Sequence, residues 1–136
     1  MKVRAVVTGL GVVSPIGNSI EEAWENMLAG KSGVGLVTRF DTANYTTKIA
    51  GEVKNFDPAA FIDKKELRRM DLAEQYALVA SELAMRDSGL DVASIDLERA
   101  GVVIGSGIGG ITTFEQQHST LVTSGPGRVS PFFIPM

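Results

Sequence analysis

The sequence contains no cysteine, which excludes disulfides, thiolate metal sites and a cysteine nucleophile within its 136 residues. It has a single histidine, and its scattered carboxylates lack the spacing of a calcium-binding loop. No apolar run approaches the roughly 18 residues that a membrane span needs, and the first residues show no signal-peptide pattern. We therefore expect a cytoplasmic protein with no metal, no cofactor and no membrane contact.

The charge balance is mildly acidic, with 13 basic and 16 acidic side chains and a formal net charge of -3. Such a chain offers no general attraction to nucleic acid, which is therefore not an expected partner. Hydrophobic residues make up 44% of the sequence, an ordinary share for a globular protein. The length is that of about one domain.

Strand-like and helix-like segments alternate along the chain. Runs of β-favouring residues predict strands over residues 3–8, 48–53 and 101–104. The last run carries no alternating polar residues and is typical of a strand buried on both faces. Apolar stripes and capping residues predict helices over residues 20–28, 72–88 and from 111 onward. This order indicates an α/β fold with a layered sheet.

A glycine-rich loop follows the last predicted strand. Gly105-Ser-Gly107-Ile-Gly-Gly110 fits the pattern G-x-G-x-x-G between a strand and a helix, which is typical of dinucleotide-binding turns. The full fingerprint also needs an acidic residue about 20 positions further on, and that count reaches Ser124-Gly-Pro126. A nucleotide-binding loop and a turn made for close packing therefore remain alternatives.

The only histidine, His118, lies three residues after Glu115 on the last predicted helix, and no G-x-S-x-G elbow is nearby. A lone histidine on a helix is usually a solvated or capping residue. We therefore expect no catalytic residue in this sequence.

Four cations fall within the six residues from Lys64 to Arg69. Lys65, Arg68 and Arg69 have the spacing i, i+3, i+4, which predicts one face of a helix. One alternative is a solvated surface with Glu66 as counter-charge. The other is a docking site for a small acidic or phosphorylated partner, steered by charge. Composition alone leaves both open.

The last residues, Ser130-Pro-Phe-Phe-Ile-Pro-Met136, are apolar and contain two prolines, which disfavour a regular strand or helix. An exposed Phe-Phe-Ile segment would be an adhesive patch. The tail therefore either folds back onto the core or packs against something outside these residues.

Several stretches together resemble the β-ketoacyl-[acyl-carrier-protein] synthases, most closely the type II synthases of bacterial fatty-acid elongation. They are Val7-Thr-Gly-Leu-Gly-Val-Val-Ser-Pro-Ile-Gly-Asn18, Arg68-Arg-Met-Asp71, Ala84-Met-Arg-Asp-Ser-Gly-Leu90, Ile104-Gly-Ser-Gly-Ile-Gly-Gly110 and Ser130-Pro-Phe-Phe-Ile-Pro135. The resemblance implies a homodimer with a thiolase-like fold. Residues 1–136 would then be an incomplete N-terminal part of that domain, with a layered α/β/α sheet.

The resemblance implies decarboxylative Claisen condensation as the activity. In this family a cysteine takes the acyl chain from acyl carrier protein, and two histidines help to decarboxylate malonyl-carrier protein and stabilise the oxyanion. His118 matches neither histidine. We therefore expect the catalytic cysteine and histidines to lie beyond the chain end, and the 136-residue chain to be inactive by itself.

The resemblance also implies binding roles. Lys65, Arg68 and Arg69 match the family's basic patch for the acidic, phosphopantetheinylated carrier protein. Ile108 matches a residue that lines the acyl pocket, with Gly107 beside it, and Phe133 matches a segment that helps to close that pocket near the dimer interface. A fatty chain gains about 0.8 kcal/mol per buried CH₂ group in such a pocket. A carrier-binding module without chemistry remains the alternative.

We expect the isolated chain to be poorly stable, because a partial sheet with an exposed edge and an apolar tail favours aggregation. Urea unfolding and light scattering would measure this. Cooperative unfolding of a soluble 136-residue monomer would contradict the expectation.

Overall fold

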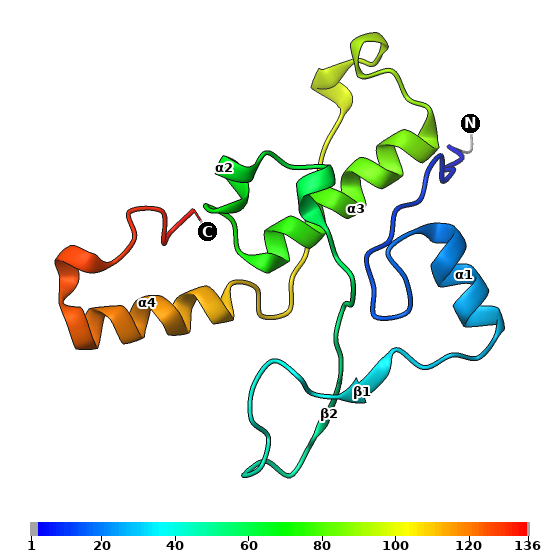
Figure 1. Cartoon of the computed structure of the whole chain (residues 1–136). Coiled ribbons are helices and arrows are strands. Elements are labelled where there is room, and N and C mark those ends of the chain that lie inside the picture. Colours follow the sequence, from blue (N-terminus) through cyan, green and yellow to red (C-terminus); the bar gives the residue numbers. More distant parts are fainter. Residues whose placement is uncertain (1–2, 136) are drawn as a thin grey trace. The chain divides into compact units, whose positions relative to one another are not determined.

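The computed structural model describes residues 3–135 (Figure 1). Its contacts divide the chain into two compact units. Unit 1 holds the described residues up to Asp57 together with Ala80–Leu90. Unit 2 holds Pro58–Val79 and the described residues from Asp91 onward. The division falls within the longest helix of the described chain, α3 (Leu72–Ser88), so this helix contributes residues to both units.

The first helix of unit 1, α1 (Ile20–Leu28), begins as the sequence predicts. The Ser19 hydroxyl accepts a hydrogen bond from the Glu22 amide at 3.2 Å. The Glu22 carboxylate in turn accepts from the amide of Asn18 at 2.8 Å, one residue before the position usual in a capping box. Gly30 follows the helix with φ 64°, a left-handed conformation that glycine adopts without a steric penalty.

The sheet of unit 1 has two short antiparallel strands, β1 (Val34–Leu36) and β2 (Ile49–Gly51). Gly35 pairs with Ala50 at the centre of the register. The strand predicted over 48–53 is confirmed in its central residues. The partner strand β1 lies outside the strands that the sequence predicts.

The predicted layered α/β/α sheet is wrong for the residues that the structure describes. Residues 3–8 and 101–104, both expected to be strands, form no strand here. Their β-favouring side chains are largely exposed, and the side chain of Val103 is 99% exposed. The physical reason is that a strand is stable only when a neighbouring strand satisfies its backbone groups, and within residues 3–135 neither segment has such a neighbour.

In unit 1 the segment with Gly9 and Gly11 lies directly on the backbone of α3. A Cβ atom added at Gly9 would be 2.6 Å from the Cβ of Ser88, and one added at Gly11 would be 2.6 Å from the Ala84 nitrogen. Between them, the Leu10 amide donates a 2.8 Å hydrogen bond to a carboxylate oxygen of Asp87. Only glycine permits so close an approach of two backbones.

Unit 2 contains the helices α2 (Lys64–Leu67) and α4 (Ile111–Ser124), besides the first half of α3. Short 3-10 helices complete it, at Pro58–Ala60, Val92–Ser94, Leu97–Arg99 and Pro126–Arg128. The helix expected after the glycine-rich loop is confirmed from its first residue. It ends at Gly125, whose φ is 83°.

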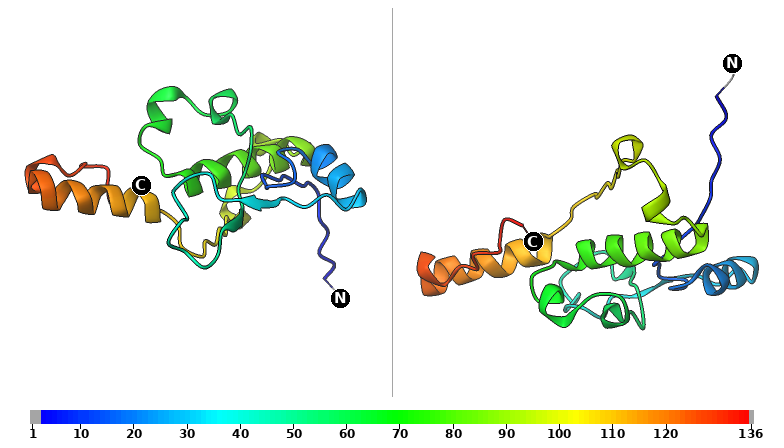
Figure 2. Two further views of the ribbon diagram at one scale, coloured as in Figure 1. Left: turned by 60° about the horizontal axis from the view of Figure 1, so that its bottom comes forward. Right: turned by 90° about the horizontal axis from the view of Figure 1, so that it is seen from above.

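The tail of unit 2 folds back along α4 (Figure 2), although Ile134 remains 87% exposed. The Ser130 amide donates a 2.7 Å hydrogen bond to the Gln117 side chain on α4. The ring of Phe133 lies 5.9 Å from the ring of Phe114.

Among the helices of residues 3–135, none combines the length and the apolar character that a membrane-spanning segment needs.

We predict that Gly11→Ala destabilises unit 1, because the added Cβ would meet the α3 backbone. Overpacking of this kind costs about 1–3 kcal/mol. Amide hydrogen exchange would show it as a loss of protection, roughly ten- to hundred-fold, across residues 80–88.

Gly35→Ala is the matched control, since an added Cβ there meets nothing within 4 Å. Its protection pattern should stay that of the parent chain. Equal protection of residues 80–88 in both variants would refute the close contact between the Gly9–Gly11 segment and α3.

Candidate functional site

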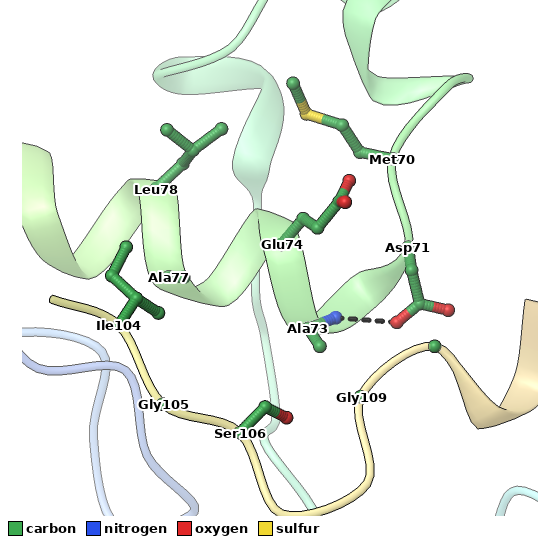
Figure 3. Close-up of a pocket in the computed structure, with 11 residues that line it drawn as sticks. Met70, Asp71, Ala73, Glu74, Ala77, Leu78, Ile104, Gly105, Ser106 and Gly109 are labelled. Carbon is green, nitrogen blue, oxygen red and sulfur yellow. Dashed lines mark hydrogen bonds between the residues drawn. The ribbon is translucent and has the colours of Figure 1, made fainter. Parts of the chain in front are cut away.

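A cavity of about 570 Å³ lies within unit 2, between the first half of α3 and the glycine-rich loop (Figure 3). Its wall on the helix side includes Ala73, Ala77 and Leu78. Ile104 contributes from the other side, with its side chain turned toward α3. The cavity is mostly apolar, and the few polar groups on its wall include Asp71 and Ser106. Such a surface suits an apolar ligand or side chain better than a charged one.

Asp71, at one end of this cavity, is only 8% exposed. One carboxylate oxygen accepts from the Ala73 amide at 2.9 Å and so caps α3. The other accepts from the Thr113 hydroxyl of α4 at 2.6 Å. A single side chain therefore ties the first turn of α3 to the first turn of α4.

The same contacts determine the charge state of Asp71. Burial acts to raise the pKa of this carboxyl, because it disfavours the charged form. The hydrogen bond from the Thr113 hydroxyl acts in the opposite direction, as do those from the backbone of Ala73, Gly110 and Thr113. Together they hold the pKa below its ordinary value, so Asp71 is an anion at neutral pH.

Gly109 and Gly110 differ from the other glycines of the loop, Gly110 in its backbone conformation and Gly109 in its close neighbours. Gly110, directly before α4, has φ 71°. A Cβ added at Gly109 would be 2.8 Å from the Ser106 hydroxyl oxygen and 3.6 Å from the Cβ of Ala73. By contrast, a Cβ at Gly105 or Gly107 would meet nothing within 4 Å. The dinucleotide fingerprint also requires a strand before the loop, and residues 101–104 form none.

Of the three residues expected to line an acyl pocket, Gly107 and Ile108 are neighbours in the glycine-rich loop, whereas Phe133 lies in the tail of unit 2. Ile108 is 79% exposed, and neither it nor Gly107 belongs to the wall of the 570 Å³ cavity. Phe133 is half-buried and lines a separate cavity of about 120 Å³ beside α4, together with Phe114 and His118. Of the three expected pocket residues, only Phe133 therefore lines either of these two cavities.

The three expected docking cations are all exposed. The prediction that they share one helical face is wrong, because α2 ends at Leu67, and a four-residue helix cannot carry positions 65, 68 and 69. Lys65 lies in α2, Arg68 caps its end, and Arg69 follows. The Arg69 guanidinium lies 4.6 Å from the ring centre of Phe132, and its Nη1 is 3.9 Å from a Glu66 oxygen.

His118 stacks on Phe114, with ring centres 6.5 Å apart and an angle of 7° between the rings. Within residues 3–135, no group of three or more His, Asp or Glu side chains is placed to hold a metal ion. The sequence does not predict the contact between Asp71 and Thr113. The two residues are 42 positions apart, and no local pattern points to a partner at that distance.

Comparison with known proteins relates the chain to condensing enzymes. Residues 2–136 match the family model described as the N-terminal domain of β-ketoacyl synthase. The chain is 52% identical over 134 residues to 3-oxoacyl-[acyl-carrier-protein] synthase 2 of Staphylococcus aureus (strain MRSA252). It is 50% identical over 134 residues to the protein of the same name from Coxiella burnetii. Each match covers 98% of this chain and 32% of the relative, so the chain spans about a third of the relatives' length.

Solved structures give the same relationship. The ishigamide ketosynthase/chain length factor matches with a TM-score of 0.76 and 31% identity, over 95% of this chain and 32% of that one. A type II PKS acyl-carrier protein in complex with its ketosynthase matches with a TM-score of 0.76 and 26% identity, over 95% of this chain and 33% of that one. The fold is thus that of a partial, thiolase-like ketosynthase N-terminal domain, mixed α/β with a small two-stranded sheet.

We predict that Thr113→Val raises the pKa of Asp71, because it removes a hydrogen bond to the carboxylate while the effect of burial remains. Carboxyl ¹³C chemical shifts followed against pH would measure this. Because the folded pKa is depressed, the stabilisation by Asp71 is complete above the unfolded value of about 3.9. It is lost as the pH falls through the folded value.

Thr112→Val is the matched control, since the exposed neighbour of Thr113 makes the same change in size and polarity on α4. The Thr112→Val variant should leave the titration midpoint of Asp71 unchanged. An unchanged midpoint in Thr113→Val would show that the hydrogen bond does not hold the carboxylate charged.

Proposed function

The chain belongs to the β-ketoacyl synthase family, whose N-terminal domain it matches over residues 2–136, and we propose that it serves as the N-terminal part of a 3-oxoacyl-[acyl-carrier-protein] synthase. That enzyme would lengthen acyl chains by decarboxylative condensation with malonyl-carrier protein. The support is the identity of about half of all aligned residues with synthases of that name. Since the chain spans about a third of those proteins, residues outside it would contribute to the reaction.

The chemistry of this reaction shows which of its steps need a covalent nucleophile. A thiolate attacks the acyl thioester and the carrier's thiol leaves. Loss of CO₂ from the malonyl thioester then gives a carbanion, which attacks the enzyme-bound acyl group and releases the thiolate. None of these 136 residues is a cysteine. We therefore assign binding roles, and no covalent role, to this chain.

The first binding role is to dock the acyl carrier protein. Lys65, Arg68 and Arg69 are exposed on unit 2, within two neighbouring turns of an otherwise acidic chain. A cationic patch attracts an acidic partner over several ångströms and orients it during the encounter. One of the similar structures contains an acyl-carrier protein bound to its ketosynthase, which supports a partner of this class. This patch is the single observation that carries the docking role.

The second binding role is to supply part of the wall against which the acyl chain lies. The Ile108 side chain is apolar and 79% exposed on the glycine-rich loop, so it is available to contact a fatty chain. Gly107 beside it adds no side chain that would narrow the space. Phe133 would close the wall from the tail, in a homodimer of the complete enzyme. Each methylene buried in this way contributes about 0.8 kcal/mol.

We predict that reversing the three charges, as Lys65→Glu, Arg68→Glu and Arg69→Glu together, weakens binding of holo-acyl carrier protein by more than ten-fold at low salt. Loss of charge complementarity would lower the association rate, and the parent's affinity would fall steeply as salt rises. Isothermal titration and stopped-flow measurements at several salt concentrations would follow both effects.

The matched control reverses three other exposed cations, Lys48, Arg99 and Arg128, which changes the net charge equally. If the effect is local to the patch, the control should retain most of the affinity. Equal weakening in both triple variants would show that binding depends on overall charge and not on this patch. Unchanged affinity in the first variant would refute the docking role.

A further inference from the structure

Within unit 2 the guanidinium of Arg69 lies over the ring of Phe132, with the Arg69 Cζ 4.6 Å from the ring centre. We propose that Phe132 is a positioning residue for carrier-protein docking, which it serves by holding Arg69 in the orientation that presents its donors to a partner carboxylate. This inference rests on the proposed docking function. It adds one residue of the tail, Phe132, to the proposed docking site.

The contact with Phe132 leaves Arg69 able to form hydrogen bonds. A guanidinium carries five N–H donors, and the Arg69 side chain remains 51% exposed. The ring therefore restrains the position of the cation while exposed donors can still bond a partner carboxylate.

Phe132 is itself held in place from α4. The Ser130 amide is bonded to the Gln117 side chain at 2.7 Å, and the Ser130 hydroxyl accepts from the Phe132 amide at 3.1 Å. On the other side of Phe132, the Phe133 ring packs 5.9 Å from Phe114. Anchors on both flanks restrict the ring before any partner arrives. Arginine ordered in advance loses less conformational freedom on binding.

The intramolecular carboxylate near Arg69 is a weak competitor. The distance from Arg69 Nη1 to the Glu66 oxygen is 3.9 Å, longer than a hydrogen bond, and both side chains are about half exposed. Exposed pairs of this kind contribute little. A carboxylate of an acidic partner can therefore replace Glu66 while the aromatic contact persists.

A double-mutant cycle tests the proposal with Phe132→Leu, Arg69→Ala and the combined variant, each titrated with holo-acyl carrier protein. A contact of this strength predicts that Phe132→Leu weakens binding about two- to five-fold in the parent chain. In the Arg69→Ala background it should have no further effect, because the residue through which it acts is gone. Phe132→Trp should restore the affinity, since tryptophan has the strongest attraction for a cation.

Phe40→Leu is the control for loss of an exposed ring elsewhere, since Phe40 is 57% exposed and packs on Tyr45 in unit 1. It should bind like the parent. Equal weakening by Phe132→Leu in both Arg69 backgrounds would show a merely structural role, and no weakening at all would equally overturn the proposal.

A spectroscopic readout separates this inference from the docking function. In the free chain, the Arg69 δ-methylene protons should show a ring-current shift that Phe132→Leu removes and Phe132→Trp retains. If the triple charge reversal leaves binding unchanged, both the docking function and this inference are refuted. If the reversal weakens binding but the ring-current shift is absent or the cycle is additive, only the role of Phe132 is refuted.

Discussion

The carboxylate of Asp71 remains charged although it is only 8% exposed, because the hydrogen bonds it accepts from two helices outweigh the effect of its burial on its pKa. One oxygen caps α3 and the other binds the Thr113 hydroxyl on α4. Thr113 stands three residues after Gly110, so its contact with Asp71 holds the C-terminal end of the glycine-rich loop next to the start of α3. Gly105, Gly109 and Gly110 of this loop line the cavity beside α3.

The surface proposed to dock a carrier protein illustrates how charge and packing act together. Net charge in the chain as a whole would repel an acidic partner, so recognition must be local. The four cations of the segment 64–69 supply the local charge, and the tail supplies an aromatic surface for one of them. The apolar tail thus contacts one of these cations through the ring of Phe132.

Backbone packs closely against backbone at Gly9 and Gly11, which lie against α3 in unit 1 at distances where a side chain would collide with the helix. Membership of the β-ketoacyl synthase family, which the match over residues 2–136 shows, accounts for the fold without requiring catalytic groups in this chain. Since none of these 136 residues is a cysteine, they hold no thiol nucleophile.

The sequence by itself determined the local features, namely the start and end of α1, the cap and end of α3, the first residue of α4 and the family. These follow from capping side chains, left-handed glycines and helical apolar spacing, which act over a few residues. Tertiary structure alone decided that residues 3–8 and 101–104 form no strand, that Thr113 meets Asp71, and that Phe132 meets Arg69. Strand pairing and long-range contacts depend on which distant groups the chain brings together, and no local pattern encodes that choice.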